Sequence, residues 1–114
     1  MSRHDPAVAL RQILSHSREA VELSQGRLRA DLDNDRLLNL ALTRLLEIVG
    51  EAANRVPEQV QSQYPDLPWL QMIGLRNRLV HGYDQVDFDI LWNIIQHDLP
   101  GLISQLEKIL SDES

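Results

Sequence analysis

Two side chains that together can cleave a phosphodiester lie five positions apart in the segment Arg76-Asn77-Arg78-Leu79-Val80-His81-Gly82-Tyr83. The guanidinium of Arg76 is always charged and matches the geometry of phosphate oxygens. Histidine, here His81, is the side chain that most readily gives and takes a proton near neutral pH. Tyr83 adds a hydroxyl that can itself be modified. These residue types are the minimum set for cutting a phosphodiester without a metal ion.

RNA is the substrate that suits this set, because its 2′-hydroxyl is a built-in nucleophile. Cleavage needs a base for the hydroxyl proton, an acid for the leaving 5′-oxygen and a cation for the charge on phosphorus. His81 can serve as the base or the acid, and Arg76 can hold the phosphate. Two chains that meet at this segment would supply both an acid and a base. DNA lacks the 2′-hydroxyl and would not be cut by this route.

We expect the segment to end a helix that starts at Pro68-Trp69, runs to about His81 and stops at Gly82. Asn77 and His81 are four residues apart and would share one face of that helix. The partial negative charge at the helix C-terminus would favour a protonated histidine. The simpler alternative is structural: an arginine and a histidine near a helix end cap carbonyls or pair with carboxylates, and the tyrosine is a half-buried aromatic.

Two carboxylates are further candidates for the site. Glu47 and Glu51 lie four residues apart in a segment that is otherwise apolar. A buried carboxylate is costly unless it is paired, so we expect them to orient Arg44, Arg55 or Arg76. The alternative is an exposed polar seam. His4, His16 and His97 lack the spacing of metal ligands, and we predict no metal and no cofactor.

The rest of the sequence predicts an all-α bundle of four or five helices. Apolar residues recur at intervals of three and four, and no Asn-Gly or Asp-Gly hairpin turn occurs. The segment that follows a cap at Asp33, Asn34 or Asp35 and ends at Pro57 is apolar on nearly every side, which is typical of a helix buried on more than one flank. We therefore expect a central helix and a homodimer. The other expected helices run from Pro6, after a cap at Asp5, to about Gln25, and from Asp87 onward with a kink or break at Pro100-Gly101.

The bulk properties narrow the class of protein. The chain has 114 residues and we expect one domain over 1–114, with a frayed tail at 110–114. A net charge of −6 argues against broad, non-specific binding of nucleic acid, so any RNA contact must be local. Cysteine is absent, and no apolar run is long enough to span a bilayer. We expect a cytoplasmic protein with no membrane partner.

The motif and its flanks resemble a known family. R-N-R-L-V-H-G-Y fits the R-x4-H-x-Y pattern of HepT-like toxins, a branch of the HEPN superfamily. The flanking blocks L-E-I-V-G-E-A-A, D-L-P-W and D-I-L-W agree with the same family, and the similarity covers roughly residues 5 to 110. The short pattern alone is weak, but together with these blocks it is fairly specific.

The resemblance implies a HEPN-type homodimer whose paired motifs line a cleft, and a metal-independent ribonuclease toxin of a toxin–antitoxin pair. Arg76 and His81 would be catalytic, with Asn77 as a polar neighbour. The implied partner is an MntA-like minimal nucleotidyltransferase, which neutralises such toxins by transferring AMP from ATP to the motif tyrosine, here Tyr83. The first alternative is a non-catalytic HEPN domain that binds nucleotides or acts as a scaffold for the nucleotidyltransferase. The second is a structural dimer without RNA chemistry.

Overall fold

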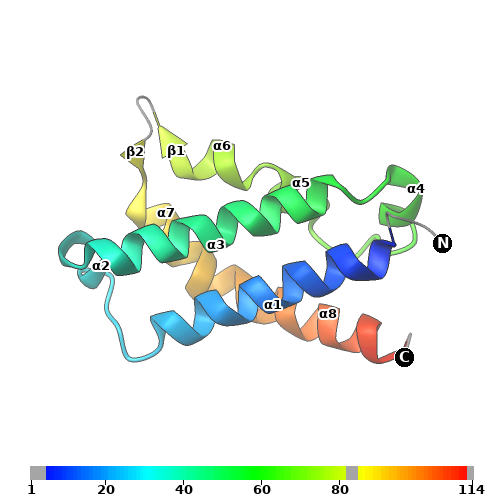
Figure 1. Cartoon of the computed structure of the whole chain (residues 1–114), viewed down its shortest axis with the longest axis horizontal. Coiled ribbons are helices and arrows are strands. Elements are labelled where there is room, and N and C mark those ends of the chain that lie inside the picture. The colour runs from blue at the N-terminus through cyan, green and yellow to red at the C-terminus, as the bar shows by residue number, and fades with distance from the viewer. Residues whose placement is uncertain (1–4, 82–84, 113–114) are drawn as a thin grey trace.

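Three long helices form the frame of the molecule in the computed structural model, which describes residues 5–81 and 85–112, without the side chains of His81 and Asp112. Helix α1 (Pro6–Ser24) runs antiparallel to α3 (Arg36–Asn54), and α8 (Leu99–Asp112) packs along α1 (Figure 1). Shorter elements cover the other side of α3. The all-α class expected from the apolar spacing is confirmed. No helix in the described part of the chain is both long and apolar enough to cross a bilayer.

The shorter elements connect and cover the frame, and they include one small hairpin. Its strands pair antiparallel, with Val80 opposite Val86 and His81 opposite Gln85. In chain order the remaining elements are α2 (Asp31–Asn34), α4 (Glu58–Gln61), α5 (Trp69–Ile73), α6 (Leu75–Leu79), β1 (Val80–His81), β2 (Gln85–Val86), α7 (Phe88–Asn93) and a π-helix (Ile94–Asp98).

The first helix starts where the sequence predicts. Asp5 caps α1 by accepting a hydrogen bond from the backbone N–H of Ala7 at 2.9 Å, and Pro6 occupies the first helical position. Asp35 caps α3 in the same way, accepting from the N–H of Leu38 at 3.0 Å. These caps satisfy N–H groups that have no partner within the helix.

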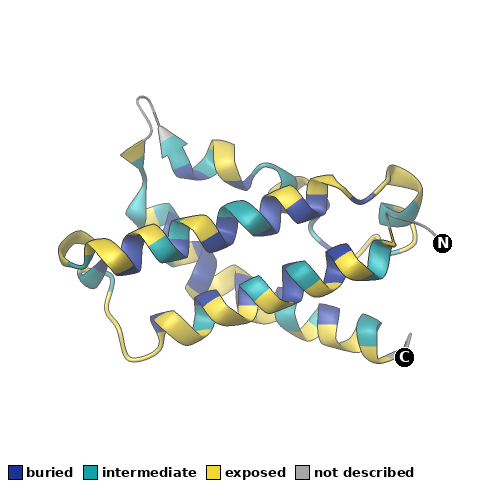
Figure 2. Ribbon diagram, viewed as in Figure 1, coloured by how far each residue is buried: buried dark blue, intermediate teal, exposed yellow. Residues whose placement is uncertain are grey.

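Helix α3 is buried on two flanks, as its apolar sequence predicts. One flank packs on α1 and the other on α5 and α6, and Figure 2 shows its buried positions turned toward these neighbours. An outer stripe remains open to solvent. It contains two leucines with unusual exposure, Leu37 at 81% and Leu40 at 48%. The largest uncovered apolar surface of α3 therefore lies near the N-terminus of the helix.

The helix expected from Pro68 to His81 is wrong in two places. It is split at Gly74 into α5 and α6, and it ends at Leu79 instead of His81. Val80 adopts extended backbone angles (φ −98°, ψ 125°), as suits a β-branched residue, and pairs with β2. The N–H of Asp87 then bonds to the carbonyl of Leu79 at 2.7 Å. Strands of two residues are too short to show an alternation of apolar and polar residues, so the sequence pattern does not predict this hairpin.

The expected break at Pro100-Gly101 takes another form. The chain stays helical from Phe88 to Asp112, and the π-helix Ile94–Asp98 precedes Pro100. Proline lacks an N–H and its ring collides with the carbonyl of the residue four earlier, which a wider turn relieves. α8 continues to Asp112, into the segment expected to fray, and residues 113–114 lie outside the described part.

Gly50 lets α5 and α6, which lead into the motif, approach α3 closely. A β-carbon built there would lie 2.9 Å from the carbonyl oxygen of Met72 and 3.6 Å from the β-carbon of Leu75. We expect Gly50→Ala to push α5 and α6 away and to lower the free energy of unfolding by about 1–3 kcal/mol, despite alanine's better helix propensity.

Gly101→Ala is the matched control, because nothing lies within 4 Å of a β-carbon at that position of α8. It should raise the free energy of unfolding by about 0.5–1 kcal/mol. Urea unfolding followed by circular dichroism measures both changes. A Gly50→Ala protein as stable as the Gly101→Ala protein would contradict this close packing.

Candidate active site

Arg76 lies on α6 and faces a wall of polar side chains on α3. It shares a small pocket of about 240 Å³ with Glu47, Gly50, Glu51, Asn54 and Ile73. The close approach at Gly50 brings α5 and α6 against this wall. Arg76 itself is exposed to solvent. The structure therefore brings Arg76 together with both candidate carboxylates, as their sequence positions alone did not require.

The two carboxylates contact Arg44, one of the three arginines that the sequence offered. Arg44 Nη1 lies 3.2 Å from Glu51 Oε1 and 3.8 Å from Glu47 Oε1. Arg55 instead donates to the side-chain oxygen of Gln12 at 3.1 Å. Within residues 5–81 and 85–112, no ion pair joins Arg76 to a carboxylate. Its guanidinium thus remains available for a phosphate.

His81 lies just beyond α6, and its backbone pairs with Gln85 in the hairpin. Its side chain and the whole of Tyr83 are outside the described part of the chain. The helix ends two residues earlier, so the expected helical face shared by Asn77 and His81 is wrong. The expectation that the helix C-terminus favours a protonated His81 loses its basis for the same reason. Asn77 is an exposed residue of α6.

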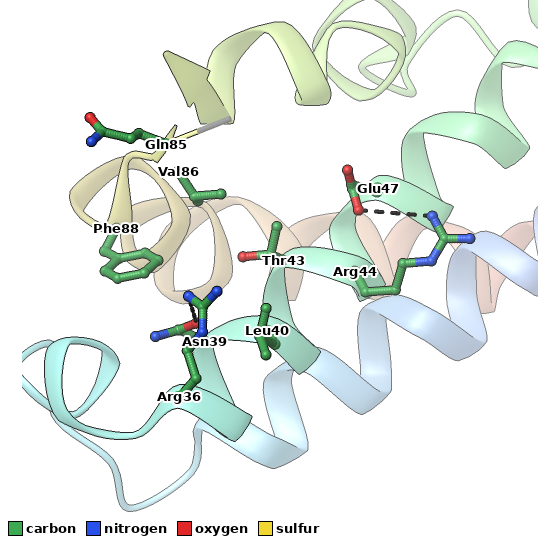
Figure 3. Close-up of a pocket in the computed structure, with 9 residues that line it drawn as sticks. All are labelled: Arg36, Asn39, Leu40, Thr43, Arg44, Glu47, Gln85, Val86 and Phe88. Atoms are coloured by element: carbon green, nitrogen blue, oxygen red, sulfur yellow. Dashed lines mark hydrogen bonds and ion pairs between the residues drawn. The ribbon is translucent and has the colours of Figure 1, made fainter. Parts of the chain in front are cut away.

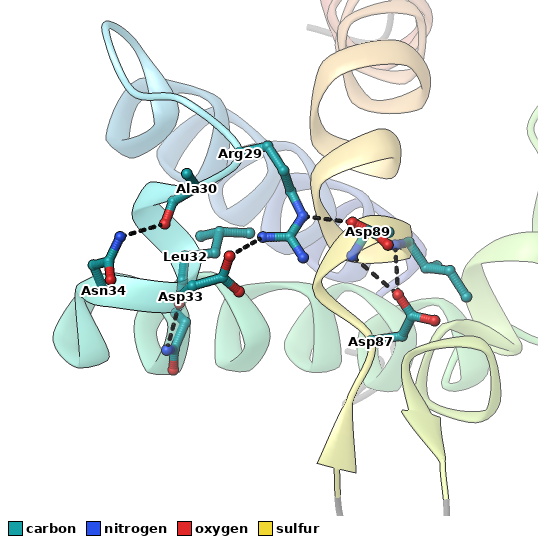
Figure 4. A network of polar contacts seen from close by, with 9 residues as sticks. Arg29, Ala30, Leu32, Asp33, Asn34, Asp87 and Asp89 are labelled. Carbon is teal, nitrogen blue, oxygen red and sulfur yellow. Dashed lines mark hydrogen bonds and ion pairs between the residues drawn. The ribbon is translucent and has the colours of Figure 1, made fainter.

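A polar network fixes the base of the hairpin where the chain enters α7 (Figure 4). Arg29 bridges two carboxylates: its Nε lies 2.6 Å from Asp89 and its Nη1 lies 3.1 Å from Asp33. The hydrogen bond to Asp89, and then the one to Asp33, raise the pKa of Arg29 above its ordinary value. Asp87 caps α7 by accepting from the N–H groups of Asp89 and Ile90. These contacts link the start of α7 to α2 and to the turn before it.

A second and larger opening lies next to the Arg76 pocket, between α3 on one side and β2 and the start of α7 on the other. We name it the α3–β2 groove, and it encloses about 770 Å³ (Figure 3). Arg36 and Phe88 line one end and Glu47 the other. The sequence analysis missed this feature. Its one signal was the spacing of Arg36, Thr43 and Glu47, which places all three near one side of a helix.

The structure also places Trp69, Arg78 and two of the remaining histidines. Trp69 is buried and donates its indole N–H to the carbonyl of Tyr64 at 3.0 Å, as expected of a core residue. Arg78 lies 3.9 Å from Asp98. His16 contacts the carbonyl of Gln12, and His97 is exposed.

Residues 8–109 match the protein family described as ribonuclease HepT-like. The chain belongs to this HepT-like family. A candidate RNase of Methanocaldococcus jannaschii is 32% identical over 96% of this chain and its own full length. A candidate ribonuclease HepT of Thermococcus cleftensis is 35% identical over 80% of this chain and 86% of its own length.

A third HepT-like relative, a candidate RNase of Caldanaerobacter subterraneus, is 32% identical over 95% of this chain and 96% of its own length. The likeness extends over 86% or more of the length of each of these relatives. No solved structure matches the chain. The resemblance inferred from the R-x4-H-x-Y segment is confirmed at the level of the HepT-like family.

Proposed function

We propose that this chain is a metal-independent endoribonuclease and the toxin of a toxin–antitoxin pair. One observation carries the proposal: Arg76 projects from α6 without a carboxylate partner among the described residues, and the chain then passes directly into the strand that contains His81. A free cation and a histidine beside it are what RNA transesterification requires. The ribonuclease names of the relatives support the same reaction class.

In the proposed reaction the 2′-hydroxyl oxygen attacks the adjacent phosphorus and the bond to the 5′-oxygen breaks. His81 takes the hydroxyl proton in one subunit, and the partner subunit's histidine gives a proton to the leaving oxygen. Arg76 binds the non-bridging oxygens, where negative charge grows in the transition state. The products are a 2′,3′-cyclic phosphate and a 5′-hydroxyl. The role of Glu47 and Glu51 is to orient Arg44 at the edge of the site through their ion pairs.

A second copy of the chain completes this proposed site. The N-terminal end of α3 exposes Leu37, which does not line the α3–β2 groove. Two such helices related by a two-fold axis would cover Leu37 on both chains. We therefore expect a homodimer by multi-angle light scattering at micromolar concentration.

Leu37→Lys tests that interface, and Leu70→Lys on α5 is its control because Leu70 is equally exposed, at 84%. The first change should shift the mass toward the monomer and the second should not. A wild-type monomer would contradict the two-chain site.

The motif tyrosine is the proposed point at which the ribonuclease is regulated. We propose that an MntA-like nucleotidyltransferase antitoxin in the cytoplasm transfers AMP to Tyr83. The tyrosine oxygen would attack the α-phosphorus of ATP, pyrophosphate would leave, and the phenolic proton would pass to solvent. The added phosphate would occupy Arg76 and repel an RNA backbone, as other charge-adding modifications do.

The experiment that tests the enzymatic part is incubation of the purified protein with RNA in the presence and absence of EDTA. We expect equal cleavage in both, because no step uses a metal. Intact RNA in both reactions would contradict the enzyme and favour the scaffold alternative.

A further inference from the structure

We propose that the α3–β2 groove binds the single-stranded RNA next to the cut, with Arg36 on a phosphate and Phe88 against a base. The inference rests on the proposed ribonuclease function and adds where the substrate lies. The groove's volume of about 770 Å³ falls in the range of small-ligand sites, roughly 300–1,000 Å³.

The groove adjoins the candidate active site. Glu47 lines both the groove and the pocket that contains Arg76. On the opposite wall, β2 pairs with the strand that contains His81. From Glu47 to Arg36 the groove follows α3 for eleven residues, or about 16 Å at ~1.5 Å per residue. That length spans up to about five nucleotides at the ~3.4 Å rise of a stacked strand, and fewer of an extended one.

Arg36 gives the far end of the groove a positive charge. It is exposed at the first position of α3, where the helix dipole disfavours a cation. Its Nη1 donates to the side-chain oxygen of Asn39 at 3.3 Å, and no carboxylate pairs with it among the residues that the structure describes. The neighbouring arginines differ, because Arg27 and Arg29 are both paired with aspartates. Arg36 is thus an unneutralised cation that faces a groove.

The other wall supplies a surface for a base. The ring of Phe88 lines the groove, and the guanidinium of Arg29 lies over that ring at 5.9 Å from its centroid. Figure 3 shows Arg36, Thr43 and Phe88 around the same space. Single-stranded RNA is recognised by stacking on aromatic rings and by cations along its backbone. A local contact of this kind also suits a chain with a net charge of −6.

The test is binding of fluorescent 2′-O-methyl oligonucleotides, which lack the attacking hydroxyl, in a length series from two to eight nucleotides. Affinity of the wild-type protein should rise with length until the groove is filled. Arg36→Ala should remove that rise and weaken the longest oligonucleotide about tenfold, while the shortest binds as before. Phe88→Leu, which keeps an apolar side chain, should do the same. Arg11→Ala is the control, since Arg11 is an exposed arginine of α1 away from the groove.

The outcomes separate the two proposals. If the wild type cleaves RNA and Arg36→Ala binds every length equally well, the groove is off the RNA path and this inference fails alone. If Arg36→Ala instead dissociates the dimer, the groove is a protein interface and the inference is overturned. If the wild type neither binds nor cleaves RNA, the ribonuclease function itself fails. Thermal unfolding of each variant, followed by circular dichroism, confirms that the compared proteins are folded.

Discussion

Replacement of His81 by alanine is expected to abolish RNA cleavage. A positioned acid–base group contributes typically ~10²–10⁴ in rate, and in a homodimer this one change removes both the base and the acid. Gel analysis of a labelled RNA under single-turnover conditions measures the loss. His81→Ala that cleaves as fast as the wild type would show that the reaction uses a different proton-transfer group.

Arg76→Ala should reduce the same rate by about 10²–10³, because it removes a charge that acts where negative charge develops. The protein should stay folded, since Arg76 is exposed and surface changes usually alter stability by no more than about 0.5 kcal/mol. Arg78→Ala is the matched control: it lies two residues further along α6 and is positioned near Asp98. Equal losses in the two variants would mean that general positive charge, and not Arg76, matters.

Tyr83→Phe should leave RNA cleavage intact and abolish neutralisation by the nucleotidyltransferase and ATP. A phenol is a poor acid–base group at neutral pH, so removal of its oxygen costs little in catalysis. Without that oxygen, no AMP can be attached. The expected result is a toxin that remains active after incubation with its partner, and mass spectrometry of the wild type should find added AMP on the peptide that contains Tyr83.

Tyr64→Phe is the control for this experiment, since Tyr64 is the other tyrosine of the chain. It should be neutralised and modified like the wild type. Complete silencing of the wild-type protein with an unmodified Tyr83 would show that the partner inhibits by covering the site.

The helical frame was predictable from the sequence because each long helix carries its own signals. Asp5 and Pro6 mark the start of α1, capping residues at 33–35 mark the start of α3, and the apolar stripes extend over many turns. The two-flank burial of α3 followed from the same reasoning. Such signals are local and repeat several times, so neighbouring residues support the same prediction.

The immediate surroundings of the motif were not predictable in the same way. The end of α6 at Leu79 depends on pairing of Val80 with Val86, a contact between two-residue strands that no periodicity reveals. The close approach at Gly50 depends on where the carbonyl of Met72 lies, which is a property of packing. Likewise, the choice of Arg44 as partner of Glu47 and Glu51 was one of three options that the sequence left open.

Product analysis in EDTA tests the central claim most directly. Once a cut is mapped, the same oligonucleotide is prepared with a single 2′-deoxynucleotide on the 5′ side of the scissile phosphate. The proposed mechanism predicts that the all-RNA substrate yields a 2′,3′-cyclic phosphate or its hydrolysed form and a 5′-hydroxyl, and that the deoxy substrate is not cut. Cleavage at the deoxy position, or loss of all cleavage when EDTA is added, would contradict a reaction driven by the 2′-hydroxyl, Arg76 and His81 without a metal.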